Sequence, residues 1–160
     1  MTPAADAPAS TDRIEKRIAL KAPRARVWRA LTDAQEFGTW FGVKFEGAFS
    51  EGATMRGLMT SKNKGAEGKP LEIVVERMKP QDLFSYRWHP NAHDPKVDYS
   101  GEPMTLVEFR LTEAGGNTTL TIIETGFDSL PVARRAPTLR SNEGGWTTMV
   151  TRIEEHVASE

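Results

Sequence analysis

The amino-acid sequence predicts an α+β domain in which a curved antiparallel sheet of about seven strands wraps around a long C-terminal helix. Between residues 43 and 125, strand-like segments follow one another with no helical segment between them. Residues 112–117 (TEAGGN) carry the strongest hairpin signal of the chain. From about residue 142 onward, apolar residues recur at the spacing of one helix face, at Trp146, Met149, Val150, Ile153 and Val157.

The first residues differ in composition from the rest of the chain. Residues 1–12 are rich in Ala, Pro, Ser and Asp and show no apolar periodicity. We therefore expect a disordered lead-in over 1–12 and a single domain over 13–160. The lead-in has neither a basic region nor a long apolar run, so no signal peptide or anchor is expected, and the expected location is cytoplasmic.

The domain is expected to open with one strand and two short helices. Polarity alternates after Arg13, which is typical of a half-buried strand. Pro23 suits a first helical turn, and the apolar residues that follow it keep helical spacing. A second helix is expected over residues 33–41, with Asp33 as its N-cap.

Strands and a closing helix are expected to follow. The strand candidates cover residues 43–49, 54–61, 71–78, 83–88, 104–111 and 118–125. Residues 89–102 form a long polar loop between two of them. Pro137 is expected to break or kink the segment that precedes the last helix.

Composition excludes several function classes. The chain has 160 residues, with 21 Lys and Arg against 22 Asp and Glu, so it carries no excess of positive charge for nucleic acid or anionic lipid. It has no Cys, which excludes disulfides, Cys-ligated zinc, iron–sulfur clusters and a Cys nucleophile. Neither a nucleotide-binding glycine motif nor a G-x-S-x-G turn is present. We therefore expect no cofactor and no metal.

Five short motifs occur in a recognisable order. They are Pro23–Trp28, Trp40-Phe41, Tyr86–Pro90 (YRWHP), Glu124–Asp128 (ETGFD) and Asn142–Trp146 (NEGGW). With the order of elements, they resemble the START/SRPBCC helix-grip superfamily, and within it the branch named for the C-terminal domain of the activator of heat-shock-protein-90 ATPase. The resemblance covers residues 13–158. It implies a hydrophobic cavity between the sheet and the last helix; members bind lipids, hormones and polyketides, and a minority catalyse reactions on them.

Two associations of this family are disfavoured by the sequence. The eukaryotic co-chaperone has a separate N-terminal domain, whereas only a short polar lead-in precedes residue 13 here, so activation of a chaperone is not the expected function. Similar sequences are also labelled as vanillate demethylase oxidoreductase components. That activity requires a Cys-ligated iron–sulfur centre, which a chain without Cys cannot hold.

Aromatic residues are the main candidates for contacts with a ligand. Phe84, Tyr86 and Trp88 share one strand face, where they either fill the core or line a cavity. Tyr86 is the informative member, because a buried hydroxyl needs a partner. The remaining residues expected to line the cavity are Trp40, Phe41, His89, Glu124, Trp146, Met149 and Val150.

Glu124 is the unusual polar residue of the predicted interior. It shares strand parity with Leu120 and Ile122, and a carboxylate on an apolar face is costly unless it is paired. Its partner could be Arg110, Arg77 or a helix N-terminus near residue 142. The alternative is a carboxyl group with a raised pKa that acts as a general acid or base.

A histidine pair lies in the polar loop. His89 and His93 are four residues apart, with Asp94 and Asp98 close behind. Prolines at 90 and 95 prevent a helix, so the spacing does not imply a metal site. His89 is expected either to bond into the loop or, like Tyr99, to offer a polar contact to a ligand at the cavity mouth.

The function expected from these features is binding of a small hydrophobic or amphipathic molecule in an internal cavity, without nucleic acid or membrane as partner. Two alternatives remain open. One is an enzyme of cyclase or aromatase type that uses Glu124, His89 or Tyr86. The other is an interaction module that activates a chaperone ATPase. Neither the ligand nor the oligomeric state follows from the sequence.

Overall fold

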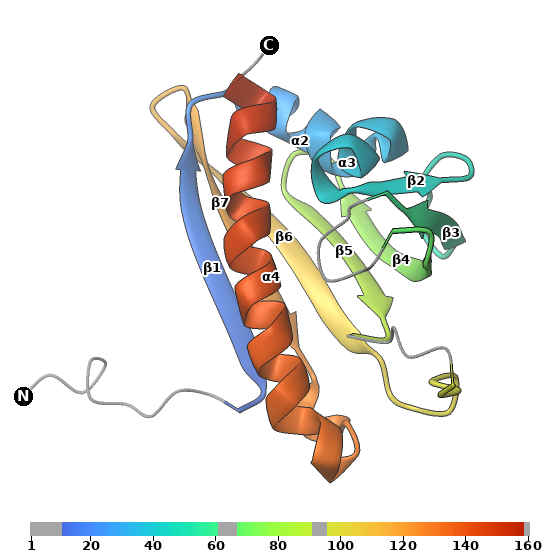
Figure 1. The fold of residues 1–160 in the computed structure, drawn as a ribbon. Coiled ribbons are helices and arrows are strands. Elements are labelled where there is room, and N and C mark those ends of the chain that lie inside the picture. The colour runs from blue at the N-terminus through green and yellow to red at the C-terminus, as the bar shows by residue number, and fades with distance from the viewer. Residues whose placement is uncertain (1–10, 61–66, 91–95, 159–160) are drawn as a thin grey trace, which may run out of the picture.

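The computed structural model describes residues 11–60, 67–90 and 96–158. It confirms the predicted α+β helix-grip class: a strand and two helices are followed by the rest of the sheet and a long helix (Figure 1). The elements are β1 (Arg13–Leu20), α2 (Arg24–Thr32), α3 (Ala34–Phe41), β2 (Val43–Phe45), β3 (Thr54–Met59), β4 (Pro70–Lys79), β5 (Leu83–Trp88), β6 (Thr105–Ala114), β7 (Asn117–Thr125), η2 (Phe127–Ser129) and α4 (Val132–Ala158).

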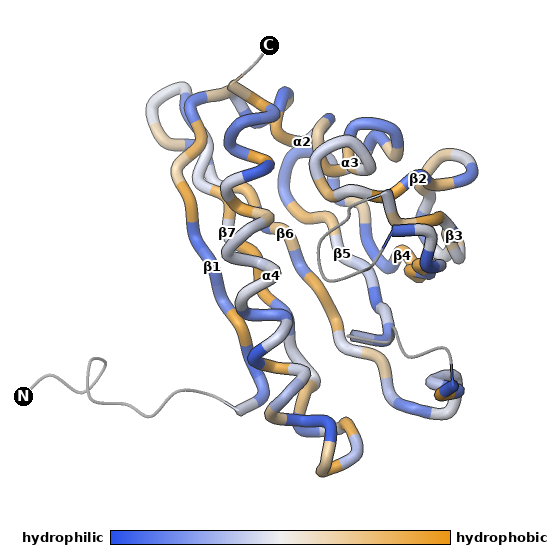
Figure 2. The backbone as a smooth tube through the Cα atoms, viewed as in Figure 1, coloured by the Kyte–Doolittle hydropathy of each residue, from blue (hydrophilic) through white to orange (hydrophobic). Residues whose placement is uncertain are grey.

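The seven strands form one antiparallel sheet in the order β1-β7-β6-β5-β4-β3-β2. The sheet curves around α4, which lies along its concave side next to β1, while α2 and α3 lie beside the C-terminal part of α4 (Figure 1). Hydrophobic and hydrophilic residues alternate along the strands (Figure 2). The core therefore lies between the sheet and the three helices.

Local sequence explains how α3 begins and ends. The Asp33 side chain accepts hydrogen bonds from the backbone N–H groups of Gln35 and Glu36, both at 3.0 Å, which confirms the predicted N-cap. Gly42 ends the helix in the left-handed conformation at φ 94°. Gly38 is required by packing, because a Cβ there would lie 2.1 Å from the carbonyl oxygen of Val43.

Two boundaries differ most from the sequence-based prediction, those at the start of α4 and at the end of β2. Helix α4 begins at Val132 and continues through Pro137, where a break or kink was expected. Pro137 cannot donate a hydrogen bond to the carbonyl of Ala133, one turn earlier, and both residues lie on the exposed side of the first turns of the helix. Strand β2 ends at Phe45 because Gly47, with φ 98°, turns the chain away. Phe49 is nevertheless buried.

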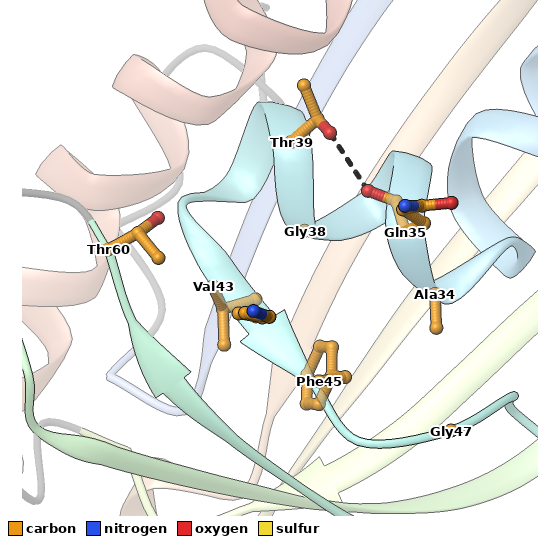
Figure 3. Close-up of a pocket in the computed structure, with 9 residues that line it drawn as sticks. Ala34, Gln35, Gly38, Thr39, Val43, Phe45, Gly47 and Thr60 are labelled. Atoms are coloured by element: carbon orange, nitrogen blue, oxygen red, sulfur yellow. Dashed lines mark hydrogen bonds between the residues drawn. The ribbon is translucent and has the colours of Figure 1, made fainter.

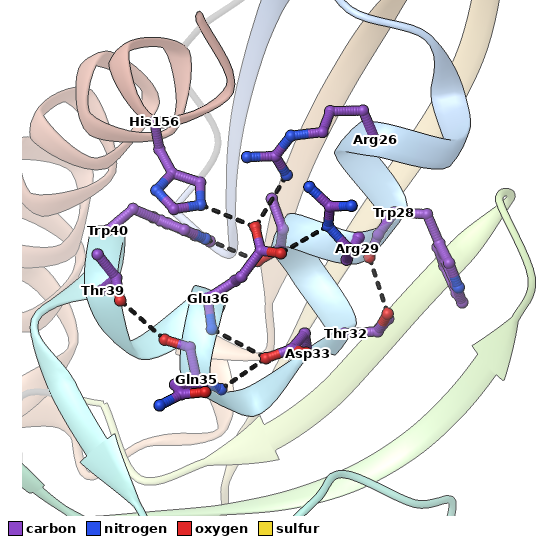
Figure 4. A network of polar contacts seen from close by, with 11 residues as sticks. Arg26, Trp28, Arg29, Thr32, Asp33, Gln35, Glu36, Thr39, Trp40 and His156 are labelled. Carbon is purple, nitrogen blue, oxygen red and sulfur yellow. Dashed lines mark hydrogen bonds and ion pairs between the residues drawn. The ribbon is translucent and has the colours of Figure 1, made fainter. Parts of the chain in front are cut away.

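A polar cluster ties the three helices together (Figure 4). The Glu36 carboxylate on α3 accepts hydrogen bonds from Arg26 at 2.8 Å and Arg29 at 2.6 Å, both on α2. His156 on α4 lies 2.9 Å from the same carboxylate. This cluster holds the C-terminal end of α4 against α2 and α3.

The last two residues of the expected lead-in, Thr11 and Asp12, bond to the η2 segment. The Thr11 hydroxyl donates to the Asp128 carboxylate, and the Asp12 carboxylate accepts from the backbone N–H of Asp128. Within the described ranges, none of the helices has the length and apolar character that would let it cross a membrane.

Candidate functional site

Glu124 on β7 lies at the centre of the interface between the sheet and α4. Its side chain is buried, and neutral donors surround its carboxylate. Oε2 accepts from Trp88 Nε1 at 2.8 Å and from Thr105 Oγ1 at 2.6 Å. Oε1 accepts from Trp146 Nε1 at 2.8 Å, and the Asn142 amide lies 3.0 and 3.1 Å from the two oxygens. Both oxygens of this carboxyl group therefore act as hydrogen-bond acceptors, and none of the four donor side chains is charged.

The predicted arginine partners of Glu124 are wrong. Arg110 pairs with Glu108 at 3.0 Å on the outer face of the sheet, and Arg77 is exposed there as well. Arg110 lies on the opposite face because it alternates with the inward-facing Phe109 and Leu111. Arg77 shares the parity of the buried Val75, but the register shifts between Val75 and Arg77, and this bulge turns Arg77 outward. Asn142 does contact Glu124, but through its side chain from within α4 rather than as part of a helix N-terminus. Among the described residues, Glu124 forms no ion pair.

The Tyr86 hydroxyl is the second polar group of this interior. Tyr86 is fully buried, and its hydroxyl has no hydrogen-bond partner among the described residues. Burial raises the pKa of Tyr86 well above its ordinary value of 10.0, and the negative charge of Glu124 raises it further. The phenol is therefore neutral near neutral pH and presents an O–H donor.

The predicted aromatic residues come together in one cluster. Phe37 of α3 lies at its centre, with its ring centroid 4.8 Å from Trp40, 5.0 Å from Phe41 and 6.3 Å from Tyr86. The Tyr86 ring lies 5.9 Å from Phe84. Trp88 and Trp146 stack at 5.9 Å, and the half-buried Met149 and Val150 pack against the same core. Tyr86 and Glu124 are thus polar groups within an apolar, aromatic surrounding.

His89 forms a hydrogen bond within the polar loop, which is the first of the two arrangements expected from the sequence. Its Nε2 lies 3.1 Å from the carbonyl oxygen of Glu102, and the ring is half-buried. Tyr99 contacts the Arg134 guanidinium, which lies 4.7 Å from its ring centroid. His93 and Asp94 lie outside the described residues. In the part of the chain that the structure describes, no three metal-binding side chains gather at one place.

Sequence reasoning missed Thr105 and the amide role of Asn142. Thr105 begins β6 and lies on the same inward face as Val107 and Phe109. Its strand parity could therefore have predicted that this polar residue is buried. Sequence alone does not indicate what such a residue bonds to. Here the hydroxyl of Thr105 and the amide of Asn142 complete the set of donors around Glu124.

A separate pocket of about 490 Å³ lies between α3 and the edge strand β2 (Figure 3). Its wall includes Gln35 and Thr39 on one side and Val43 and Phe45 on the other. The Thr39 hydroxyl is engaged, since it donates to the carbonyl of Gln35 at 2.9 Å. None of the residues expected to line the cavity belongs to this pocket. The sequence did not predict it, because it depends on how the edge of β2 meets α3.

Solved structures share this fold over most of the chain. MLL2253 from Mesorhizobium loti matches with a TM-score of 0.71 and 20% identity, covering 92% of this chain and 97% of that one. CalU16 from Micromonospora echinospora matches with a TM-score of 0.62 and 20% identity, covering 91% and 75%. DynU16, a protein of the dynemicin biosynthetic locus, matches with a TM-score of 0.69 and 24% identity, covering 92% of this chain and 47% of its own.

This chain therefore spans about half the length of DynU16 and nearly the whole of MLL2253. Identities at this level show a common fold. No curated protein sequence matches. The model of the family described as activator of Hsp90 ATPase homolog 1-like protein matches residues 21–158, which include the whole aromatic cluster and the donors around Glu124. The chain belongs to this family.

Proposed function

We propose that this protein binds a small hydrophobic or amphipathic molecule between the sheet and α4, beside Tyr86. The observation that carries the proposal is the Tyr86 hydroxyl, which is fully buried and has no partner among the described residues. Burying a hydroxyl without a hydrogen bond costs about 1–3 kcal/mol, so buried hydroxyls nearly always have a partner. A guest that offers an acceptor would remove that cost.

The surroundings of Tyr86 suit such a guest. Aromatic rings of Phe84, Trp88 and Phe109 lie within contact distance of the Tyr86 ring, with centroids 5.1 to 5.9 Å away. Apolar walls with a few well-placed polar groups are the usual composition of small-molecule sites. Membership of the family supports the same class of function, since the matched residues 21–158 include nearly all of the apolar core of this chain.

We assign Glu124 a positioning role rather than that of a general acid or base. Five donated hydrogen bonds occupy its two oxygens, and the donors come from β5, β6 and α4. A carboxylate engaged in this way is poorly placed to exchange protons with a substrate. Its hydrogen bonds instead fix the distance between α4 and the sheet, on which the shape of the interior depends.

A role as an interaction module is less well supported by the surface of the sheet. The outer face carries paired charges: Arg56 with Glu72 at 2.8 Å, Arg87 with Glu76 at 2.8 Å and Arg110 with Glu108 at 3.0 Å. Protein interfaces usually show an apolar centre depleted of charges. We therefore place the function in the interior.

Native mass spectrometry of gently purified protein tests the proposal, together with thermal shifts across a library of lipids and aromatic compounds. A bound small molecule, or a library compound that raises Tm, is the expected result. The Tyr86→Phe variant should bind the same compound more weakly. Tyr99→Phe is the matched control. Tyr99 is the only other tyrosine of the sequence, and its ring lies in the polar loop against Arg134 of α4. A chain without any guest and without any stabilising compound would contradict the proposal.

A further inference from the structure

Glu124 and Tyr86 differ in their remaining capacity to form hydrogen bonds. Glu124 already accepts hydrogen bonds at both oxygens from Trp88, Thr105, Asn142 and Trp146. The Tyr86 hydroxyl, in contrast, donates to none of the described residues although it is fully buried. A guest in contact with both would therefore find a free donor at Tyr86 and an acceptor at Glu124 whose lone pairs are in use.

Charge restricts the guest further. The Glu124 carboxylate carries a negative charge, and no cation pairs with it among the described residues. Tyr86 pairs with Val107 on β6, and Val107 pairs with Glu124 on β7, so Tyr86 and Glu124 lie in one row across the inner face of the sheet. The charge of Glu124 also contributes to raising the pKa of the Tyr86 phenol. A second anion at Tyr86 would face this repulsion inside an apolar surrounding, where screening by water is weak.

From these two observations we infer that the guest presents a neutral carbonyl oxygen to the Tyr86 hydroxyl, and that molecules with a carboxylate at this position are rejected. The inference rests on the proposed function, since it concerns the same site. Tyr86 acts in it as the residue that selects the polar group of the ligand, and Glu124 as the fixed charge that excludes anions.

A cationic guest is the main competitor to this inference. Aromatic faces beside a carboxylate can hold a quaternary ammonium group through cation–π attraction. Such a cation would not satisfy the Tyr86 hydroxyl, because it has no acceptor. A neutral carbonyl satisfies the donor and avoids the repulsion, so it accounts for both groups.

Four naphthalene probes of similar size separate these cases: 2-acetylnaphthalene, 2-ethylnaphthalene, 2-naphthoate and (2-naphthylmethyl)trimethylammonium. Their Kd values are measured by equilibrium dialysis on the full chain and on Tyr86→Phe. The ketone should bind about tenfold more tightly than the ethyl compound, as one net hydrogen bond of about 1.4 kcal/mol implies. The carboxylate should bind most weakly. In Tyr86→Phe the ketone should lose its advantage over the ethyl compound, because its carbonyl would be buried without a donor, and Tyr99→Phe should behave as wild type.

The order of the four Kd values on the wild-type chain tests the inference by itself. The test therefore remains possible even if the Tyr86→Phe chain does not fold. Tightest binding of the carboxylate or the ammonium compound would overturn the inference and leave the proposed function intact. So would an unchanged ketone preference in a folded Tyr86→Phe chain. If no probe binds but a guest co-purifies, a guest without a carbonyl overturns the inference. Absence of both probe binding and a guest would overturn the inference and the proposed function together.

Discussion

The indole rings of Trp88 and Trp146 stack with centroids 5.9 Å apart and planes inclined by 29°. Each also donates its Nε1–H, at 2.8 Å, to a different oxygen of Glu124. Trp88 belongs to β5 and Trp146 to α4, so one carboxylate on β7 joins two strands and the closing helix. Hydrogen bonds to a charged acceptor are stronger than neutral ones, and burial in an apolar surrounding removes competition from water.

Replacement of Glu124 by Gln should destabilise the protein by about 3 kcal/mol. Gln keeps the shape of the side chain but has an NH2 group in place of one acceptor oxygen. The hydrogens of this NH2 group would face the N–H or O–H donors that now bond to Glu124. Urea unfolding gives the free energy of unfolding. Glu72→Gln is the control, because its exposed pair with Arg56 should contribute less than about 1 kcal/mol. Equal losses in the two variants would contradict the anchoring role of Glu124.

Trp88→Phe and Trp146→Phe should each cost more stability than Trp40→Phe. All three substitutions remove an indole N–H and shrink a buried ring, but Trp40 donates to the neutral carbonyl of Ala30 at 2.8 Å. The lost bonds to Glu124 are charge-assisted and should cost about 1.5–3 kcal/mol, against about 1 kcal/mol at Trp40. The double variant Trp88→Phe/Trp146→Phe should fall short of the sum by at least about 0.5 kcal/mol, because both residues share one acceptor. Strict additivity in a double-mutant cycle would count against the shared network.

The order of elements could be predicted because each depends on local pattern. Alternating polarity predicted the strands, helical spacing predicted α2 to α4, and the Asp33 cap needs only its own neighbours in sequence. The closing helix was predicted too short, because a proline usually ends a helix, whereas here Pro137 lies at an exposed position within the first turns of α4.

The candidate site could be predicted only in part. Strand parity predicted that Glu124 is buried and that Tyr86 and Trp88 face inward, which the structure confirms. The donors around Glu124 could not be predicted, since they lie 18 to 36 residues away in the chain and none of them is charged. A search for a charged partner leads to arginine, whereas curvature of the sheet brings two tryptophans and an asparagine instead.

The glycines of the helices should respond to alanine with opposite signs. Gly144 and Gly145 lie within α4, and a Cβ added to either would meet nothing within 4 Å. Alanine should therefore raise stability by about 0.5–1 kcal/mol at each site, because it restricts the unfolded chain and favours the helix. Gly38→Ala should lower stability by about 1–3 kcal/mol, because its Cβ would collide with the carbonyl of Val43. Thermal unfolding of the three variants checks the signs, and a loss at Gly144 would show that close packing, rather than helix propensity, sets that position.

The Glu36 cluster should make part of the stability depend on pH. Burial alone would raise the pKa of Glu36, but hydrogen bonds from His156, Arg29 and Arg26 outweigh it and lower the pKa below 4.5. The folded chain therefore binds this proton more weakly than the unfolded chain. The contribution of Glu36 is fully present above about pH 4.5 and is lost as the pH falls through the lowered pKa.

The measurement compares wild type with Glu36→Gln in urea unfolding from pH 7 down to pH 3. At neutral pH the wild type should be more stable, and the difference should shrink as the pH falls below about 4.5. Glu154→Gln serves as the control, since Glu154 is an exposed side chain on the helix that carries His156. A difference between wild type and Glu36→Gln that stays constant down to pH 3 would show that the carboxylate charge does not hold α4 against α2 and α3.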